Sequence, residues 1–249
     1  MKKWIFFGFL FLLTRSLFAE APAPEALLEQ MDTILRSSSH HMTVTMDVKT
    51  KNWQRHYKME VWMKGVDRVF VRVLEPAKSA GQAFLRLKSK LWNYLPTAER
   101  TLLIPLSMMT DKVLGSDFSN DDLVKLSYLP RDYDSKILGE ETFEGEETYH
   151  LELRPKPAAP VIYEKLELWL RKKDSLPLRM IFFDEHLKPL RTLHYSNPKM
   201  MDGLERPTVW RMENHKDPTR DTTFTILEAQ YGIEIADHLF SQENMEKYP

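Results

Sequence analysis

The chain has 249 residues, of which 43% are hydrophobic and 11% aromatic, and this composition excludes an intrinsically disordered protein. Its formal net charge of −1 excludes nucleic-acid binding through an overall basic field. The chain contains no cysteine, so disulfides, thiolate metal ligands and a thiol nucleophile are excluded as well. Its stability must come from a packed core, for which the length suffices.

The N-terminus has the layout of a cleavable secretory signal. Two lysines precede an apolar run over residues 4–13, which is shorter than the roughly 20 residues that a membrane-spanning helix needs. We expect a signal peptide of residues 1–19, cleaved after Ala19 or at the latest after Ala23. A lipoprotein signal would require a cysteine at the cut, so the protein is not expected to be a lipoprotein itself. We predict a periplasmic protein whose residues 20–249 form a single domain.

The first element predicted after the signal is an amphipathic helix over residues 24–37, and strands follow it. The helix has apolar residues at helical spacing, namely Leu27, Leu28, Met31, Ile34 and Leu35. From residue 41 apolar and polar residues alternate, which is typical of half-buried antiparallel strands. This pattern predicts a meander of about six strands over residues 41–48, 57–63, 69–73, 83–87, 91–95 and 101–104.

The strand pattern breaks between about residues 106 and 134. Residues 107–115 are predicted to form a short helix that ends at Gly115. Ser119, followed three residues later by Asp122, predicts a capping box at the start of a second short helix. Both helices are candidates to cover one face of the sheet.

Strand patterns return after the break and continue almost to the C-terminus. They cover residues 136–139, 148–154, 163–171, 178–184, 189–195, 207–213 and 220–231, and a final helix over residues 236–247 has Asp237 as its candidate N-cap. A sheet of eleven or twelve strands must curl strongly. The predicted fold is therefore mainly β (α+β), with a strongly curved antiparallel sheet.

Two motifs give the chain a resemblance to a known family. Residues 91–100, Leu-Trp-Asn-Tyr-Leu-Pro-Thr-Ala-Glu-Arg, contain a W-x-Y-x-P strand, and residues 115–123, Gly-Ser-Asp-Phe-Ser-Asn-Asp-Asp-Leu, form a G-S-D-F-S-x-x-D-L turn and helix. In this order and spacing they resemble a divergent branch of the outer-membrane lipoprotein-sorting (LolA-like) proteins. The resemblance extends over nearly the whole chain after the signal and includes the closing segment 237–241.

The resemblance implies an unclosed β-barrel with helices covering its concave face, and a cavity there that takes acyl chains. It implies a periplasmic carrier of lipid or of lipoprotein acyl chains, with an inner-membrane donor protein and an outer-membrane acceptor protein as partners. A carrier of this kind works without catalysis and without a cofactor. An arginine that gates the cavity is not assigned, because Arg68, Arg72 and Arg86 fit equally well.

The residues expected to line this cavity follow from the alternation within the strands and from the family fold. Methionine suits a cavity for acyl chains because it is unbranched and adaptable, and Met108 and Met109 of the covering segment are further candidates. The expected lining consists of Met59, Val61, Met63, Val69, Val71, Leu168, Met180 and Phe182. Trp92 and Tyr94 lie on one face of their strand. They are expected either to gate the mouth of the cavity or to pack beneath the helices of residues 106–126.

Catalytic and metal-binding signals are weak in this sequence. No nucleophile elbow, zinc-protease helix, P-loop or dinucleotide fingerprint is present. His40 and His41 would point to opposite faces of a strand, and the acidic residues 117–122 lack the glycine and glutamate of a calcium loop. We predict no catalytic residue and no metal site.

Two other classes of function stay open at this point. A non-catalytic envelope sensor or scaffold of the same fold is the main alternative to the carrier, although a dedicated signalling module would add a second domain that the sequence does not show. An envelope hydrolase would require a carboxylate, a histidine and a serine within hydrogen-bond reach in one pocket.

Overall fold

The computed structural model describes residues 22–125, 129–157, 159 and 161–247, so the signal peptide and its cleavage site lie outside the described residues and stay predictions. The first element is the helix α1 (Pro24–Arg36). Proline opens it at a position where the missing N–H costs nothing. The apolar face that the sequence predicted is the face that packs inward, and its buried side chains include Leu27, Leu28 and Met31.

Thirteen strands form one antiparallel sheet, in the order β6-β5-β4-β3-β2-β1-β13-β12-β11-β10-β9-β8-β7. The strands are β1 (Ser39–Lys49), β2 (Gln54–Lys64), β3 (Arg68–Glu75), β4 (Ala83–Leu87), β5 (Lys90–Leu95), β6 (Arg100–Leu103), β7 (Tyr133–Phe143), β8 (Glu146–Pro155), β9 (Lys165–Arg171), β10 (Pro177–Phe183), β11 (Pro189–Met201), β12 (Leu204–Asn214) and β13 (Asp221–Tyr231). Every strand predicted from alternation is present; β4 has the predicted ends, and the ends of most others are shifted.

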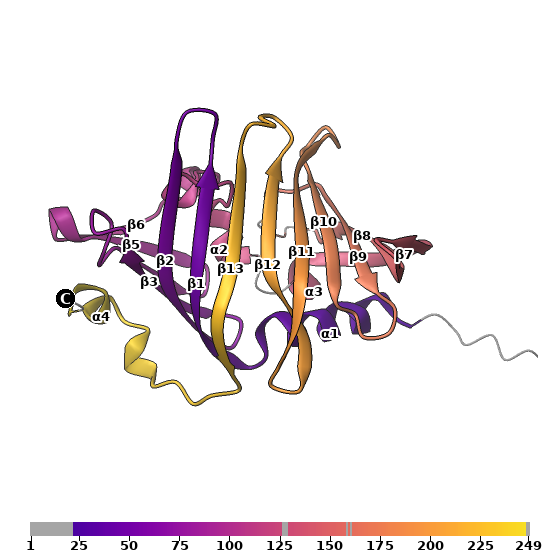
Figure 1. The fold of residues 1–249 in the computed structure, drawn as a ribbon, viewed down its shortest axis with the longest axis horizontal. Helices are drawn as coiled ribbons and strands as arrows, with labels where there is room; N and C mark the ends of the chain where they lie inside the picture. The colour runs from indigo at the N-terminus through magenta and orange to yellow at the C-terminus, as the bar shows by residue number, and fades with distance from the viewer. Residues whose placement is uncertain (1–21, 126–128, 158, 160, 248–249) are drawn as a thin grey trace, which may run out of the picture.

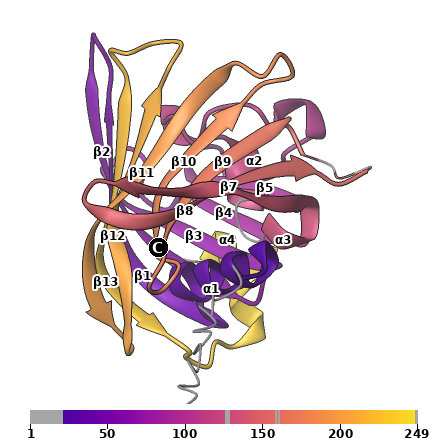
Figure 2. The ribbon, with the colours of Figure 1, turned by 90° about the vertical axis from the view of Figure 1, so that its right-hand side faces the viewer.

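The sheet is strongly curved and does not close into a barrel. β6 and β7 lie at its two edges, and β1 pairs with β13, so that the two meanders join in the middle of the sheet. Figure 1 views the sheet from its convex side, with β1, β2, β13 and β12 in front, and Figure 2 shows α1 and α3 (Leu129–Asp132) on its concave side. The predicted fold class is confirmed.

The segment between the two edge strands crosses the concave side of the sheet. It consists of two 3₁₀ turns, η2 (Leu106–Met108) and η3 (Val113–Gly115), followed by the helices α2 (Asn120–Lys125) and α3 (Leu129–Asp132). The single helix predicted over residues 107–115 is therefore wrong. Leu114 and Gly115 both have positive φ, 54° and 76°, and this backbone conformation cannot continue a right-handed helix.

The C-terminal segment packs on the convex side. It contains the 3₁₀ turn η4 (Asp237–Leu239) and the helix α4 (Gln242–Lys247), which replace the one helix predicted over residues 236–247. Asp237 is not a cap: its carboxylate pairs with Lys64 and Arg68, at 2.7 Å from each. The N-terminus of α4 is capped by Ser241, whose hydroxyl accepts a hydrogen bond from the N–H of Asn244.

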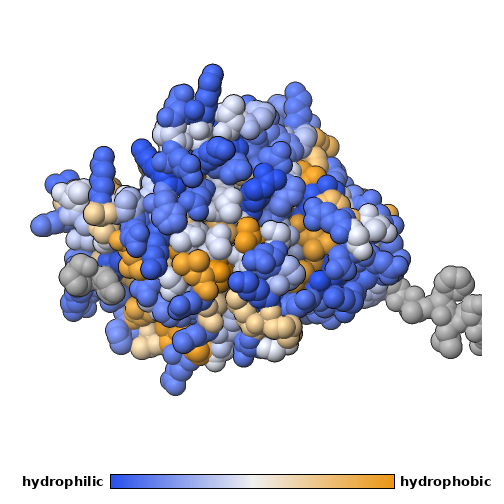
Figure 3. All heavy atoms as spheres, viewed as in Figure 1, coloured by the Kyte–Doolittle hydropathy of each residue, from blue (hydrophilic) through white to orange (hydrophobic). Residues whose placement is uncertain are grey.

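Apolar side chains pack on both sides of the sheet. Two large clusters lie on the concave side, one beneath α1 and the other beneath the turn η3. A third lies on the convex side, where the C-terminal segment covers β3, β4 and β5. The rest of the convex face is largely hydrophilic, with hydrophobic residues toward the C-terminal segment and a second group on the right-hand side of the view (Figure 3).

Candidate functional site

Two adjoining cavities lie between the concave face of the sheet and the segment that crosses it. The first has a volume of about 180 Å³ and is lined by strands β1 to β4, β12 and β13 on one side and by residues 113–122 on the other. The second, of about 170 Å³, continues toward α1. Together they lie at the lower end of the range of about 300–1,000 Å³ that is usual for small-molecule sites.

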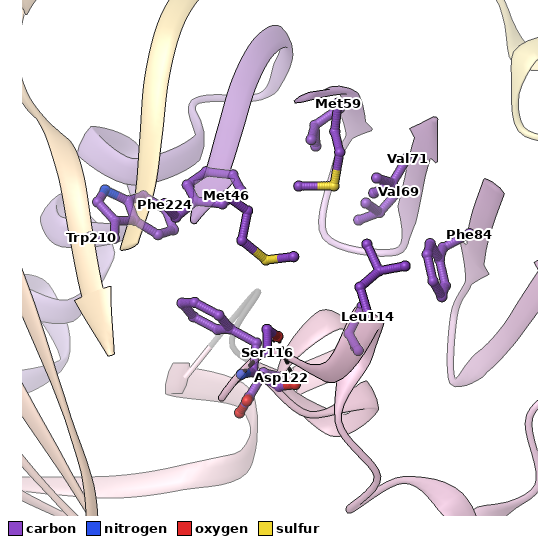
Figure 4. Close-up of a pocket in the computed structure, with 13 residues that line it drawn as sticks. Met46, Met59, Val69, Val71, Phe84, Leu114, Ser116, Asp122, Trp210 and Phe224 are labelled. Atoms are coloured by element: carbon purple, nitrogen blue, oxygen red, sulfur yellow. Dashed lines mark hydrogen bonds between the residues drawn. The ribbon is translucent and has the colours of Figure 1, made fainter. Parts of the chain in front are cut away.

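The two cavities share their central lining. The shared residues are Val61, Val69, Phe118, Asp122, Trp210 and Phe224. The valines and the three aromatic residues among them belong to inward faces of the fold, yet each is only half-buried. A core residue of this kind is normally packed on all sides, so these side chains face space that the protein itself does not fill. Figure 4 shows how several of them point toward one another across the first cavity.

Six of the ten predicted lining residues surround these cavities. Met59 and Val71 line the first, Met63 and Met180 line the second, and Val61 and Val69 line both. Cross-strand pairing brings most of them together, because Val61 lies opposite Val71, and Met63 opposite Val69, between β2 and β3. The covering segment places Met109 in the core below and leaves Met108 43% exposed.

Two predicted residues point inward but do not line either cavity. Leu168 and Phe182 are fully buried beneath α1, in contact with the cluster that contains Leu27 and Leu28. Their strands have the expected alternation, but the helix fills the space in front of them. The unfilled space lies further along the sheet, toward β1, β2 and β3.

Trp92 and Tyr94 lie on the opposite, convex side of the sheet, so neither gates the cavity. They pack in the cluster of Phe70, Phe240 and Met245, beneath the C-terminal segment and not beneath residues 106–126. The prediction that they line the cavity is wrong, as is the alternative that placed the covering helices above them. Alternation shows that they share a face, and only the path of the C-terminus shows which face it is.

The covering segment is held over the cavities by Asp122. The capping box predicted from the sequence is present: the N–H of Ser119 donates to Asp122 Oδ2 at 2.7 Å, and the N–H of Asp122 donates to Ser119 Oγ at 3.2 Å. Arg191 of β11 donates to both oxygens of the same carboxylate, at 2.8 and 3.0 Å. The hydroxyl of Tyr163 donates to Asp122 Oδ1 as a third contact at 3.0 Å.

Asp117 forms a second attachment between the covering segment and the sheet. Its carboxylate accepts hydrogen bonds from Asn214, Arg220 and Thr222 at 2.9 to 3.1 Å and lies 3.2 Å from Lys112. Burial by itself would raise the pKa of Asp117, but the hydrogen bonds from Asn214 and Arg220 outweigh it and hold that pKa below its ordinary value. Asn214 is the last residue of β12, Thr222 lies in β13 and Arg220 directly precedes β13, so this carboxylate joins the covering segment to the middle of the sheet.

The second cavity has a polar end beside the last turn of α1. Asp32 and Arg36, an ion pair within that helix, line it together with His40. Burial raises the pKa of Asp32, and the charge of Arg36 opposes this increase. His40 is 5% exposed, and burial lowers its pKa to about 4. Its Nδ1 lies 3.0 Å from the backbone carbonyl of Arg36.

The end of α1 is itself fixed by Arg206 of β12. This arginine is 1% exposed and donates to the carbonyls of Thr33 and Ile34 in the last turn of the helix, where the carbonyl of Thr33 also accepts from the N–H of Ser37. Its guanidinium group lies 3.7 Å from the ring centroid of Tyr231. No spacing in the sequence indicated this contact, because β12 follows α1 by more than 160 residues.

The three arginines considered as gates are on two different sides of the sheet. Arg68 pairs with Asp237, and Arg72 donates to the carbonyls of Gly81, Asn244 and Met245, so both attach the C-terminal segment to the convex side. Arg86 lies two residues after Phe84 on β4 and therefore on the same, concave face of the sheet, and it is 1% exposed. Burial lowers the pKa of Arg86 to about 10.

Several lining residues escaped the sequence analysis. Met46 and Phe84 belong to predicted inward alternations and could have been included on that signal. Trp210 and Phe224 lie in strands from the far end of the chain, which only the pairing of β1 with β13 brings beside Met46. Phe118, in the turn before α2, lines both cavities.

The described residues contain no cluster of three or more His, Asp or Glu side chains that could hold a metal ion. None of the helices in the described ranges is both long and apolar enough to cross a membrane.

Comparison with known proteins places the fold. The chain superposes on a DUF1329 family protein from Desulfovibrio piger with a TM-score of 0.83 and 23% identity, covering 89% of this chain and 97% of that one. A putative outer membrane lipoprotein-sorting protein domain from Vibrio parahaemolyticus gives 0.80 at 22% identity, covering 90% and 98%. A LolA superfamily protein from Nitrosomonas europaea gives 0.78 at 23% identity, covering 90% and 100%.

Sequence comparison adds a family. No curated protein matches the chain significantly. A family model described as "uncharacterized protein" matches residues 65–247, which is well over half of the chain. The protein therefore belongs to that family, and its fold is that of the LolA-like outer-membrane lipoprotein-sorting proteins.

Proposed function

We propose that this protein is a periplasmic carrier that binds lipid, or the acyl chains of lipoproteins, in the two adjoining cavities on the concave side of its sheet. One observation supports this most directly: Val61, Val69, Phe118, Trp210 and Phe224 are inward-facing and apolar, yet only half-buried around a cavity. Burying an acyl chain there would be favourable by about 0.8 kcal/mol for each methylene removed from water.

The shape and chemistry of the lining suit a flexible apolar chain. Met46, Met59 and Leu114 can adjust their rotamers around ligands of different shape, whereas the strands behind them are fixed by the sheet. The charged group shared by both cavities, Asp122, is already paired with Arg191. Such a site offers tight burial without a reactive group, which is consistent with transport in outer-membrane lipoprotein sorting and not with catalysis.

In this proposal the protein works between two membranes. The signal-like N-terminus would bring it to the periplasm, where an inner-membrane donor would deliver the cargo and an outer-membrane acceptor would take it. The similarity to the putative outer membrane lipoprotein-sorting protein domain from Vibrio parahaemolyticus supports a role in lipoprotein sorting, at an identity that indicates the fold and not the cargo.

The test is native mass spectrometry of the protein purified from the periplasm of an expressing cell without detergent, followed by solvent extraction. Co-purifying phospholipid or a triacylated peptide is the expected result. A variant with Val61→Phe, which places a ring in the space between the two cavities, should lose this ligand. Val209→Phe, on a strand position that alternates with the inward-facing Trp210, is the matched control and should keep it.

A mass without ligand that persists after lipids and lipoproteins are offered would contradict the carrier proposal. In that case a non-catalytic envelope sensor or scaffold with the same fold would become the better explanation.

A further inference from the structure

Exposed apolar side chains gather along one edge of the sheet. β6 is the edge strand at the opposite end of the sheet from β7, and the covering segment begins directly after it (Figure 1). Leu106 in that segment is 84% exposed. The neighbouring exposed apolar residues are Leu102, Leu103 and Met108, and no charged residue lies between Arg100 and Asp111. Apolar residues concentrated on an exposed surface usually mark an interaction site.

The other edge of the sheet is protected against further strand pairing, and β6 is not. β7 carries exposed charged side chains at Asp134, Lys136, Glu140 and Glu141, and its pairing with β8 contains a bulge. Charges and bulges are usual means by which proteins prevent an edge strand from accepting another strand. β6 pairs with β5 in an unbroken register and has a charged residue at its start alone, Arg100.

The free side of β6 presents backbone groups that can pair with another strand. The N–H of Ile104 donates to the carbonyl of Leu91, which lies on β5. Backbone groups alternate in direction along an antiparallel strand, so those of Leu102 also point toward β5, and those of Thr101 and Leu103 point away from it. Within the described part of the chain, no strand lies on that side. β6 therefore offers two N–H and two C=O groups that another strand can satisfy and a lipid surface cannot.

Pairing with β6 of a second copy satisfies all four groups in one register. With a two-fold axis beside Leu102, Thr101 of each copy lies opposite Leu103 of the other, and each such pair exchanges two hydrogen bonds. The two Leu102 side chains then meet across the axis. Pro105 has no N–H, so a register shifted toward it loses a hydrogen bond. The edge is therefore complementary to itself in this register.

The same register brings uncharged surfaces together beyond the two strands. Arg100 lies opposite Ile104 of the second copy and not opposite another charge. The direction of the chain carries Leu106 toward the turn η1 (Pro96–Ala98) of the second copy, which has no charged residue. The contact would involve residues 96–108 of each copy, fewer than the roughly 20–30 residues per side of a standard interface. The expected dimer is therefore weak and reversible.

We infer that the protein forms a two-fold symmetric dimer through antiparallel pairing of β6 with β6 of a second copy, with the exposed leucines packed around the axis. The sheets of the two copies then continue into one another. This inference is independent of the proposed carrier function, because no residue of β6 lines either cavity.

Analytical ultracentrifugation of the mature protein at increasing concentration tests the dimer, and its molar mass should rise from that of a monomer toward twice that value. Leu103→Lys places a charge in the contact. Leu103→Pro removes an N–H that β5 does not use, a change that edge strands tolerate. Each variant should weaken self-association about tenfold.

Leu138→Lys is the matched control, because Leu138 lies on the other edge strand and is similarly exposed, at 46% against 53% for Leu103. It should dimerise as the unmodified protein does. Circular dichroism and urea unfolding show whether each variant is folded.

The absence of cysteine from the chain allows a direct test of the register. Leu102→Cys places its thiol beside the two-fold axis, where opposite Cα atoms lie about 4.5 Å apart, within the reach of a disulfide. During oxidation at micromolar protein concentration, Leu102→Cys should form a covalent dimer about tenfold faster than Leu138→Cys, because pairing raises the effective concentration of the thiols.

A monomer at every concentration would overturn the inference. If that monomer bound phospholipid vesicles and Leu103→Lys did not, the exposed leucines would be assigned to a lipid surface instead. Self-association that survives Leu103→Lys, or that Leu103→Pro leaves intact, would contradict pairing through β6. Equal oxidation rates of Leu102→Cys and Leu138→Cys would exclude the two-fold register.

Discussion

Arg191 on β11 and Asp122 in the first turn of α2 form a paired contact through both carboxylate oxygens, at 2.8 and 3.0 Å. The side chains are 11% and 1% exposed, so the pair is shielded from solvent. It joins the covering segment to the half of the sheet that lies beyond β13. The cover of the two cavities is thus attached by buried charges.

Removing Arg191 should detach the cover and leave a buried charge without its partner. We expect Arg191→Met to lower the free energy of unfolding by about 3–5 kcal/mol, measured by urea denaturation. The double variant Arg191→Met with Asp122→Asn should recover much of that loss, because the uncompensated carboxylate is gone. Arg211→Met is the matched control, since Arg211 is 43% exposed on β12, and should change stability little. Equal losses in all three variants would contradict this role of the pair.

A charge placed in the second cavity should remove the ligand. Met63 and Met180 line that cavity. Met63→Glu and Met180→Glu should each abolish lipid co-purification and lower the free energy of unfolding by about 1–3 kcal/mol. Met200→Glu is the control, because Met200 is 68% exposed and lines neither cavity. Solvent extraction followed by mass spectrometry gives the lipid content. Folded Met63→Glu or Met180→Glu protein with unchanged lipid would sink the assignment of these residues.

Tyr94 should matter for stability and not for binding. It is 9% exposed beneath the C-terminal segment on the convex side. We expect Tyr94→Ala to lower the free energy of unfolding by about 3–5 kcal/mol, the usual loss for a large buried aromatic residue, while bound lipid per folded protein stays constant. If Tyr94→Ala lost lipid as completely as Met63→Glu, a purely structural role on the convex side would not explain that loss, and the prediction would be wrong.

His40 should make stability depend on pH. Its pKa falls from 6.5 in the unfolded chain to about 4 in the folded protein, mainly because it is buried, while the charges of Arg36 and Arg206 act in the same direction. Below pH 6.5 the unfolded chain therefore binds a proton that the folded protein does not. The free energy of unfolding should decrease from pH 6.5 to pH 4, by about 1.4 kcal/mol for each pH unit.

The comparison of two histidine variants checks this assignment by urea denaturation at several pH values. His40→Gln should reduce the decrease, whereas His186→Gln, at an exposed turn between β10 and β11, should retain it. The same decrease in both variants would show that other groups cause it.

Local patterns in the sequence were sufficient to predict most of the helices and strands and the faces of the first strands. Alternation fixed Met59, Val61 and Met63 on one face of β2, because successive side chains of a strand point to opposite sides. Helical spacing fixed the buried face of α1 in the same way. Ser119 and Asp122 specified their capping box through contacts only three residues apart. All of these features depend on neighbours in the chain.

Which part of the inward-facing surface forms a cavity depends on contacts between residues that are far apart in the chain. Leu168 and Phe182 have inward alternation, but α1 packs against them and fills the space. Trp92 and Tyr94 lie under the C-terminal segment, whose course across the convex side no local pattern specifies. The attachments of the cover by Arg191 and Arg220 join residues 69 and 103 positions apart. Alternation divides side chains between the two faces of the sheet. Long-range packing determines which parts of these faces are covered by other segments and which part is left open for a ligand.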